Sequence, residues 1–153
     1  MNRSWAEYKV GFGERSGNYW LGNDLLSQLT ANYSYKLKID LQSITYGYWY
    51  VAKYSRFRVL PESPYNYTLQ AGGFSGNASY DALGDSSGAM FSTFDRDNDL
   101  DSYYNYAARY GGGFWFGYYI RCMMNAAFSA GNFQWYRLPG GPGLQRSRMW
   151  LMC

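Results

Sequence analysis

Residues 91–116 read FSTFDRDNDLDSYYNYAARYGGGFWF, and this stretch decides the interpretation of the fold. Its acidic run places Asp95, Asp97, Asp99 and Asp101 at alternate positions, ahead of a tyrosine-rich segment and a triple glycine. An extended or looped chain brings alternate side chains to one side, whereas a helix scatters them around its axis. Carboxylates held so close repel one another unless a cation lies among them, and calcium accepts oxygen ligands from irregular loops. The pattern therefore predicts a calcium loop, with a solvated acidic turn as the alternative.

The spacing excludes the commonest kind of calcium loop. An EF-hand loop that begins at Asp95 needs glycine at its sixth position and glutamate at its twelfth. Those positions hold Leu100 and Tyr106. This excludes an EF-hand and leaves a calcium loop of a different kind, or a solvated acidic turn, as the alternatives.

The composition restricts the class of protein. A chain of 153 residues is long enough for one domain with a buried core. Aromatic residues make up 22% of it, and tyrosine, with an apolar ring and a polar tip, suits binding surfaces as well as cores. The net charge is only +3, and the basic residues are not clustered in the sequence, so a nucleic-acid partner is not expected. No stretch approaches the roughly 20 apolar residues of a membrane span.

Short N-glycosylation patterns favour a secreted protein. They begin at Asn2, Asn32, Asn66 and Asn77. The N-terminal residues do not form a signal peptide, so a leader would lie outside this sequence. The expected location is extracellular.

Alternating hydrophobicity predicts strands in the first half of the chain. Residues 35–41, YKLKIDL, place apolar and polar side chains at strictly alternating positions, as a half-buried strand requires. Residues 47–59 suit a second antiparallel strand, with Tyr48, Tyr50, Tyr54 and Phe57 as its aromatic members. Residues 67–70 suit a third.

The remaining segments predict a short helix, a loop and a last strand. A helix is expected over residues 25–30, with Asp24 as its N-cap and Leu25, Leu26 and Leu29 as its apolar face. The small, polar and glycine-rich residues 71–88 predict a long surface loop, and residues 149–152 a terminal strand. No linker or internal repeat divides the chain, so we expect a single domain over residues 1–153.

In the order of these segments, the sequence resembles the fibrinogen C-terminal domain, in the form of the invertebrate fibrinogen-related lectins. The matching segments are WAEYKVGFG, NYWLGNDLLSQLT, KLKIDL, AKYSRFRV, YTLQAGGFSG, FSTFDRDND and GGGFWF. The resemblance extends from about Trp5 to Leu151 and covers the later part of the family's domain. The family's N-terminal strands and first disulfide would precede Trp5. It implies an α+β fold with a twisted antiparallel sheet, short helices and a loop-rich region for calcium and ligand.

The resemblance also implies one bound Ca²⁺ ion. Asp97 and Asp99 match the family's side-chain ligands, and the backbone carbonyls of Asp101 and Tyr103 would complete the shell. Asp95 matches an aspartate that supports the loop rather than binding the ion.

The family's ligand pocket holds an acetyl group between aromatic rings and two backbone N–H groups. Such a site buries the methyl group and satisfies the carbonyl oxygen. By position, Tyr110 and Tyr136 match the aromatic cage, and Tyr119 and Ile120 match the amide donors. Asn125 matches the asparagine of a turn beside the pocket.

Departures from the family pattern concentrate at this pocket. The nearby disulfide would join the positions of Tyr106 and Tyr119, which could stack in its place, and loss of such a bridge typically costs about 2–5 kcal/mol. Ile120 replaces a histidine. Cys122 and Cys153 could pair with each other, with a partner chain, or stay free, and an alternative alignment lets Cys122 stand for the missing second cysteine.

These observations favour a calcium-dependent, secreted recognition domain of the innate-immune lectin type, binding acetylated groups or carbohydrates. The alternative is a protein-binding module of a matrix or receptor-ligand protein, and a third hypothesis is a truncated form that folds poorly. Assembly into a homo-oligomer stays open, because related lectins gain avidity from several heads. An enzyme is not expected, because the chain holds no histidine for a Ser or Cys triad, no zinc-type cluster and no phosphate-binding glycine motif.

Overall fold

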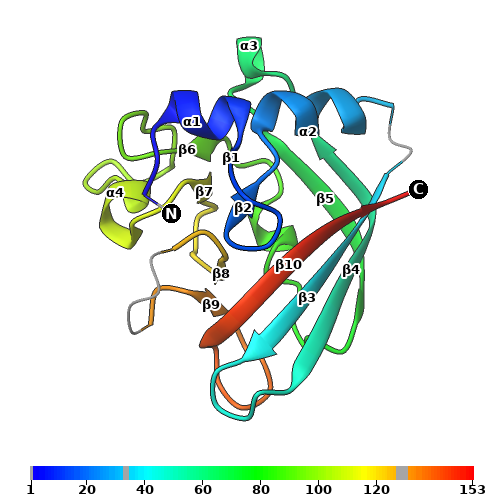
Figure 1. The fold of residues 1–153 in the computed structure, drawn as a ribbon. Helices are drawn as coiled ribbons and strands as arrows, with labels where there is room; N and C mark the ends of the chain where they lie inside the picture. Colours follow the sequence, from blue (N-terminus) through cyan, green and yellow to red (C-terminus); the bar gives the residue numbers. More distant parts are fainter. Residues whose placement is uncertain (1, 33–34, 127–130) are drawn as a thin grey trace.

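A four-stranded antiparallel sheet forms one side of the molecule, and short helices, two-residue strands and loops form the other (Figure 1). The computed structural model describes residues 2–32, 35–126 and 131–153. The strand order of the sheet is β10-β3-β4-β5. Its strands are β3 (Lys36–Ser43), β4 (Trp49–Val59), β5 (Leu69–Gly76) and β10 (Leu144–Met152).

The other elements are short, and four of them are helices. The helices are α1 (Trp5–Val10), α2 (Asn23–Thr30), α3 (Glu62–Tyr65) and α4 (Tyr106–Tyr110), with a 3-10 turn at Gly84–Ser86. The two-residue strands are β1 (Phe12–Gly13), β2 (Tyr19–Trp20), β6 (Phe91–Ser92), β7 (Phe114–Trp115), β8 (Cys122–Met123) and β9 (Gln134–Trp135). They pair as β1-β2, β6-β7 and β8-β9.

The alternation in β3 orients the sheet as predicted. Leu37, Ile39 and Leu41 are buried, while the residues between them point away from the core. The core lies between this face and the loop-rich side, where large aromatic rings meet edge to face. Trp115 is fully buried and its indole N–H donates to the Tyr67 carbonyl at 2.7 Å. Offset and edge-on aromatic pairs of this kind add to the free energy of area burial.

Two expectations for single elements were wrong. The expected loop at residues 71–88 begins as strand, because β5 continues to Gly76 along β4 despite its glycines. The helix α2 begins at Asn23 and has no side-chain cap, since the Asp24 carboxylate accepts instead from the Tyr67 hydroxyl. Leu25, expected on the apolar face of α2, is 41% exposed.

The other predicted segments agree more closely. The terminal strand exists and is longer than expected, starting at Leu144. The second strand starts at Trp49, which leaves Tyr48 outside it and 67% exposed. The glycosylation pattern that starts at Asn32 lies partly outside the described residues. Within the described part of the chain, no helix is long and apolar enough to cross a membrane.

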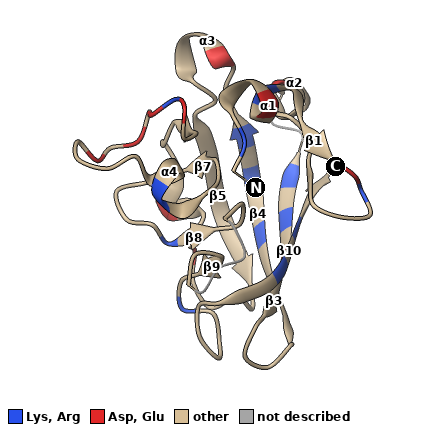
Figure 2. Ribbon diagram, turned by 60° about the vertical axis from the view of Figure 1, so that its left-hand side comes forward, with Lys and Arg blue, Asp and Glu red and all other residues tan. Residues whose placement is uncertain are grey.

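The charge distribution differs from the sequence-based expectation. On the sheet face turned away from the core, β3, β4 and β10 carry lysine and arginine side chains. Figure 2 marks the positions of these residues along the strands as blue bands. The basic residues, which are spread along the sequence, therefore gather on one sheet face in three dimensions. Residues distant in sequence share this face because the strand register brings them together.

Candidate functional site

The acidic loop spans residues 93–105 and is held at both ends by asparagine side chains. Asn98 Nδ2 donates to the Phe91 carbonyl at 2.8 Å, and its backbone N–H donates to Ser92 Oγ at 3.0 Å. At the far end, Asn105 Nδ2 donates to the Thr93 carbonyl at 3.2 Å, and Asn105 Oδ1 caps α4. These bonds close the loop onto the short β6-β7 pair.

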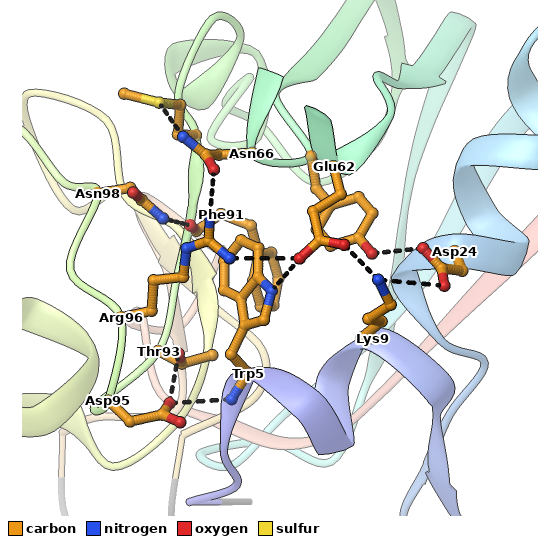
Figure 3. A network of polar contacts seen from close by, with 12 residues as sticks. Trp5, Lys9, Asp24, Glu62, Asn66, Phe91, Thr93, Asp95, Arg96 and Asn98 are labelled. Carbon is orange, nitrogen blue, oxygen red and sulfur yellow. Dashed lines mark hydrogen bonds and ion pairs between the residues drawn. The ribbon is translucent and has the colours of Figure 1, made fainter. Parts of the chain in front are cut away.

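The base of the loop is tied to the N-terminal helix. The Asp95 carboxylate accepts from the Trp5 backbone N–H at 2.9 Å and from Thr93 Oγ1 at 2.7 Å (Figure 3). The Arg96 guanidinium lies 4.1 Å from the Trp5 ring centroid and donates to Glu62 at 3.2 Å and Asn66 at 2.8 Å. The Asp95 carboxylate is thus hydrogen-bonded within the protein and oriented toward α1.

Beyond this base, the two expected side-chain ligands lie close together. Asp97 Oδ1 accepts from the Asp99 backbone N–H at 3.2 Å. Asp99 accepts from the backbone N–H groups of Asp101 and Tyr106, each at 2.9 Å. Burial raises the pKa of Asp99, and the neighbouring Asp97 charge adds to the rise, while the bonds from Tyr106 and Asp101 oppose it. A cation between these carboxylates would relieve this repulsion.

The Asp101 side chain has a structural role in the loop. Its carboxylate accepts from the backbone N–H groups of Tyr103 and Tyr104, at 2.8 and 3.2 Å, and from the Tyr106 hydroxyl at 2.8 Å. The Tyr103 bond, the largest cause, and the Tyr106 hydroxyl lower the pKa of Asp101. The side chain is therefore occupied, while among the described residues no backbone N–H donates to the carbonyls of Asp101 or Tyr103.

The available oxygen donors suit a calcium site that includes backbone carbonyls or water, rather than a metal site built from side chains alone. Among the described residues, no group of three or more His, Cys, Asp or Glu side chains converges as metal ligands. A cation here would instead use the Asp97–Asp99 pair with carbonyl oxygens or water, and calcium accepts such mixed oxygen shells. Asp97, Asp99, Asp101 and Tyr103 therefore stay the predicted metal residues.

A pocket of about 400 Å³ adjoins the acidic loop. One wall consists of loop residues and the start of α4, and the other of the segment that follows β7. The lining residues are Leu100, Asp101, Ser102, Tyr106, Gly117, Tyr118 and Tyr119. The predicted calcium loop and this cavity thus share Asp101.

The residues predicted from the resemblance as an aromatic cage belong to two separate clusters. Tyr110 lies beside Tyr106, with ring centroids 6.1 Å apart. Tyr136 lies under the Arg121 guanidinium at 4.3 Å and against Tyr80. Neither Tyr110 nor Tyr136 lines the pocket beside the acidic loop.

The predicted amide donors are better placed. Tyr119 lines the pocket, and neither its backbone N–H nor that of Ile120 donates to an acceptor within the described residues. Asn125, by contrast, is buried, and its Nδ2 donates to the Gly113 carbonyl at 3.0 Å. A Cβ on Gly112 would lie 2.0 Å from the Asn125 carbonyl oxygen, so this close backbone approach requires glycine.

The tyrosines at the missing disulfide do not stack on each other. Tyr106 packs against Tyr110 and Phe116, whereas Tyr119 packs against Tyr118. Tyr106 and Tyr119 face the same pocket instead, because the Tyr106 hydroxyl is held by Asp101.

Both cysteines are free, so they do not pair with each other. Cys122 is buried and its thiol donates to the Ala82 carbonyl at 3.5 Å. Burial raises the pKa of the Cys122 thiol, which makes it unreactive. Cys153 is exposed at the end of β10.

Sequence reasoning missed much of the pocket wall. Leu100, Ser102, Gly117 and Tyr118 line the cavity but carried no functional signal in the sequence. The GYY run after the buried β7 was the nearest available sign, since it places exposed tyrosines directly after a core strand.

Comparison with known proteins gives a consistent family match. The family model for the fibrinogen beta and gamma chains, C-terminal globular domain, matches residues 1–140. Protein scabrous of Drosophila melanogaster is 39% identical over 131 residues, which is 86% of this chain and 16% of that protein. Microfibril-associated glycoprotein 4 of Mus musculus is 42% identical over 118 residues, which is 74% of this chain and 45% of that protein. The chain therefore spans less than half the length of either relative.

Solved structures give the same result for the fold. The fibrinogen-like globe domain of human ANGPTL2 matches with a TM-score of 0.85 and 33% identity. The match covers 98% of this chain and 72% of that one. The predicted α+β fold, with its antiparallel sheet and few short helices, is confirmed.

Proposed function

Because the chain belongs to the family of fibrinogen C-terminal globular domains, we propose that it is an extracellular recognition domain that binds acetylated or carbohydrate ligands with calcium. Its relatives are extracellular fibrinogen-like proteins, which supports a secreted location. The observation that carries the proposal is the pocket that shares Asp101 with the acidic loop. A catalytic activity is not part of the proposal.

The residues of this pocket suit a small ligand with an apolar methyl and a polar oxygen. The rings of Tyr106 and Tyr119 supply apolar walls, and the Tyr119 N–H has no protein acceptor among the described residues. The Ile120 N–H also has no protein acceptor there, but Ile120 follows Tyr119 in the chain without lining the pocket. Amide donors beside aromatic walls suit an acetyl group, because one side of that group is apolar and the other accepts hydrogen bonds. Bound calcium would neutralise the Asp97–Asp99 pair and hold the loop in place.

Calorimetric titration with N-acetylglucosamine tests the proposal, with glucose as the ligand that lacks the acetyl group. We expect saturable binding of N-acetylglucosamine in calcium, and loss of binding in excess chelator. Tyr119→Ala should weaken binding, whereas Tyr46→Ala, which removes an equally exposed tyrosine outside the pocket, should not. Absence of saturable binding in calcium would contradict the proposal.

A second candidate function, protein binding, is favoured by exposed tyrosines around the pocket. Tyr103, Tyr104, Tyr118 and Tyr119 are 89%, 57%, 74% and 60% exposed. Tyrosine is enriched at protein interfaces because it buries a large ring at low entropic cost. The two functions are distinguished by a glycan array that gives no signal, together with saturable binding of an extracellular protein that Tyr103→Ala weakens.

A further inference from the structure

The outward face of the four-stranded sheet collects a large share of the positive charge of the protein. Its basic residues are Lys36, Lys38, Lys53, Arg56, Arg58, Arg146 and Arg148, half of the 14 lysines and arginines in the chain. We call this surface the basic sheet face. Most of these side chains are exposed, because the residues that alternate with them along each strand point into the core.

The register arranges these charges along a diagonal. Lys38 on β3 lies directly opposite Lys53 on β4. Lys36 lies two residues before Lys38 on β3 and therefore on the same face of the sheet. Arg56 and Arg58 continue along β4 in that direction.

At the other end of the diagonal, Arg146 and Arg148 lie on β10, opposite Gln42 and Asp40 of β3. From Arg146 to Arg58 the row extends roughly 30 Å, with strands about 4.8 Å apart and same-face residues about 7 Å apart. The result is an extended array of cations.

Little negative charge offsets this array. Within the four fully described strands, Asp40 is the only carboxylate, and it already pairs with Lys38 at 2.9 Å and accepts from the Trp150 indole N–H at 2.7 Å. No carboxylate of the described residues forms an ion pair with Lys36, Lys53 or Arg146. An array of like charges with so few carboxylates beside it favours an external polyanion, whose binding releases condensed salt ions.

We propose that the basic sheet face binds a sulfated polysaccharide chain. Such a chain is extended and carries fixed negative charges at short intervals, which complements an extended row of lysines and arginines. The assignment of a polysaccharide rests on the extracellular location given under the proposed function. The surface itself is separate from the pocket beside the acidic loop, so calcium is not required for this binding.

Nucleic acid is the less suitable polyanion for this surface. Single strands bind to grooves in which free aromatic rings stack on the bases. Here the Arg148 guanidinium lies 5.3 Å from the Trp49 ring centroid, and Trp150 is held by Asp40. Duplex DNA is commonly recognised through a helix or ribbon that enters a groove, and the face of a four-stranded sheet offers neither.

The test measures binding of a heparin octasaccharide by the full chain in excess chelator, over a range of salt concentrations. We expect binding that weakens steeply with salt. The variant Lys36→Gln/Lys53→Gln should raise the Kd about tenfold and reduce the salt slope by roughly 1–2. The matched control, Arg15→Gln/Arg109→Gln, changes net charge equally at exposed positions off the sheet and should change the Kd less than about twofold.

Each other outcome overturns the proposal. If both double variants weaken binding equally, net charge rather than the sheet face is responsible. If a desulfated, N-acetylated octasaccharide or a 20-nucleotide thymidine strand binds as tightly as heparin, the assigned ligand class is wrong. The heparin measurement is made without calcium. A negative result would therefore not contradict calcium-dependent binding of N-acetylglucosamine in the pocket, and the two proposals can fail separately.

Discussion

The acidic loop and the basic sheet face are the two charged regions of this molecule, and they are assembled differently. The loop collects its carboxylates from the short run Asp95–Asp101, whereas the sheet face collects its cations from positions between Lys36 and Arg148. Figure 2 shows the acidic residues of the loop apart from the blue bands of the strands. The carboxylates of the acidic loop are therefore close together in the sequence itself. The cations of the basic sheet face come together only when the strands pair.

The two regions also handle repulsion differently. In the loop, Asp99 and Asp101 are held by backbone N–H groups and by the Tyr106 hydroxyl, and the Asp97–Asp99 pair remains close. On the sheet, the pleat spaces the cations, and their long side chains reach into water. Crowded carboxylates favour one small cation, while spaced ammonium and guanidinium groups favour a long polyanion.

The largest expected effect concerns the loop. Calcium at 100 times its Kd should stabilise the protein by about 2.7 kcal/mol. For a domain of this size that raises the Tm by roughly 5–11 °C. Asp97→Asn/Asp99→Asn should abolish this rise, because both predicted side-chain ligands lose their charge. Thermal unfolding followed by circular dichroism, with calcium and with chelator, measures it.

Asp81→Asn is the matched control for the loop variant. Asp81 also lies in a loop and accepts from a backbone N–H, that of Gly84 at 2.9 Å. It should keep the full calcium-induced rise, as should Lys36→Gln/Lys53→Gln. A rise that survives in Asp97→Asn/Asp99→Asn would show that calcium binds elsewhere.

A smaller effect is expected from the anchor of the loop. Arg96→Ala removes the bonds to Glu62 and Asn66 and the contact with the Trp5 ring. Hydrogen bonds to charged groups contribute about 1.5–3 kcal/mol, and the Arg96 side chain is partly exposed, so a loss of about 1–2 kcal/mol is expected.

Urea unfolding measures this loss, with Arg109→Ala as the control. Arg109 is also a loop-side arginine, and within the described part of the chain it lies against the exposed Tyr104 ring, 5.1 Å from its centroid. Its replacement should change the unfolding free energy by less than about 0.5 kcal/mol. Equal losses in the two variants would mean that Arg96 does not anchor the loop.

The same contrast explains how far the sequence could be interpreted. Short sequence patterns predicted the strand with Leu37, Ile39 and Leu41, the acidic loop and the family. Each of these predictions depends only on residues that are neighbours in the sequence. The partner of Lys38 across the sheet depends on register, which no local pattern contains. The basic sheet face could therefore not be predicted from the sequence, in which each lysine of a strand is indistinguishable from an ordinary solvent-facing residue.

The pocket was predictable only in part for the same reason. Tyr119 and the loop were identified, but the wall at Gly117 and Tyr118 comes from a segment that reaches the loop through the fold. Tyr110 and Tyr136 were assigned to one cage by resemblance, yet packing draws them to Tyr106 and to Arg121.

A pH dependence should follow from Glu62 at the base of the loop. The Lys9 hydrogen bond, the largest cause, and then the Trp5 indole lower the pKa of Glu62 below its usual 4.5. A carboxyl whose folded pKa is lowered stabilises the fold above its unfolded pKa, and this contribution disappears as pH falls through the folded value. The unfolding free energy should therefore fall less between pH 5 and 3 in Glu62→Gln than in the parent, by roughly the linkage of one carboxyl.

Glu14→Gln is the control for this titration, because Glu14 is exposed in the β1-β2 turn and forms no ion pair with any described residue. Its variant should follow the pH dependence of the parent. If Glu62→Gln also follows the parent, the network in Figure 3 does not contribute to acid sensitivity.

The smallest expected effect is the coupling between the two charged regions. Since the loop and the sheet face share no residue, calcium should change the Kd for heparin octasaccharide less than about twofold, and linkage requires heparin to change calcium affinity by the same factor. Bound calcium adds two positive charges to the whole molecule. That long-range field is screened beyond about 8 Å at physiological ionic strength, so any residual coupling should vanish as salt rises.

Titration of heparin into the calcium-loaded and calcium-free protein at two salt concentrations measures this coupling, and Asp97→Asn/Asp99→Asn removes the calcium contribution. A coupling above about fivefold that persists at high salt would mean that one ligand spans both regions, and the contrast between them would then be wrong.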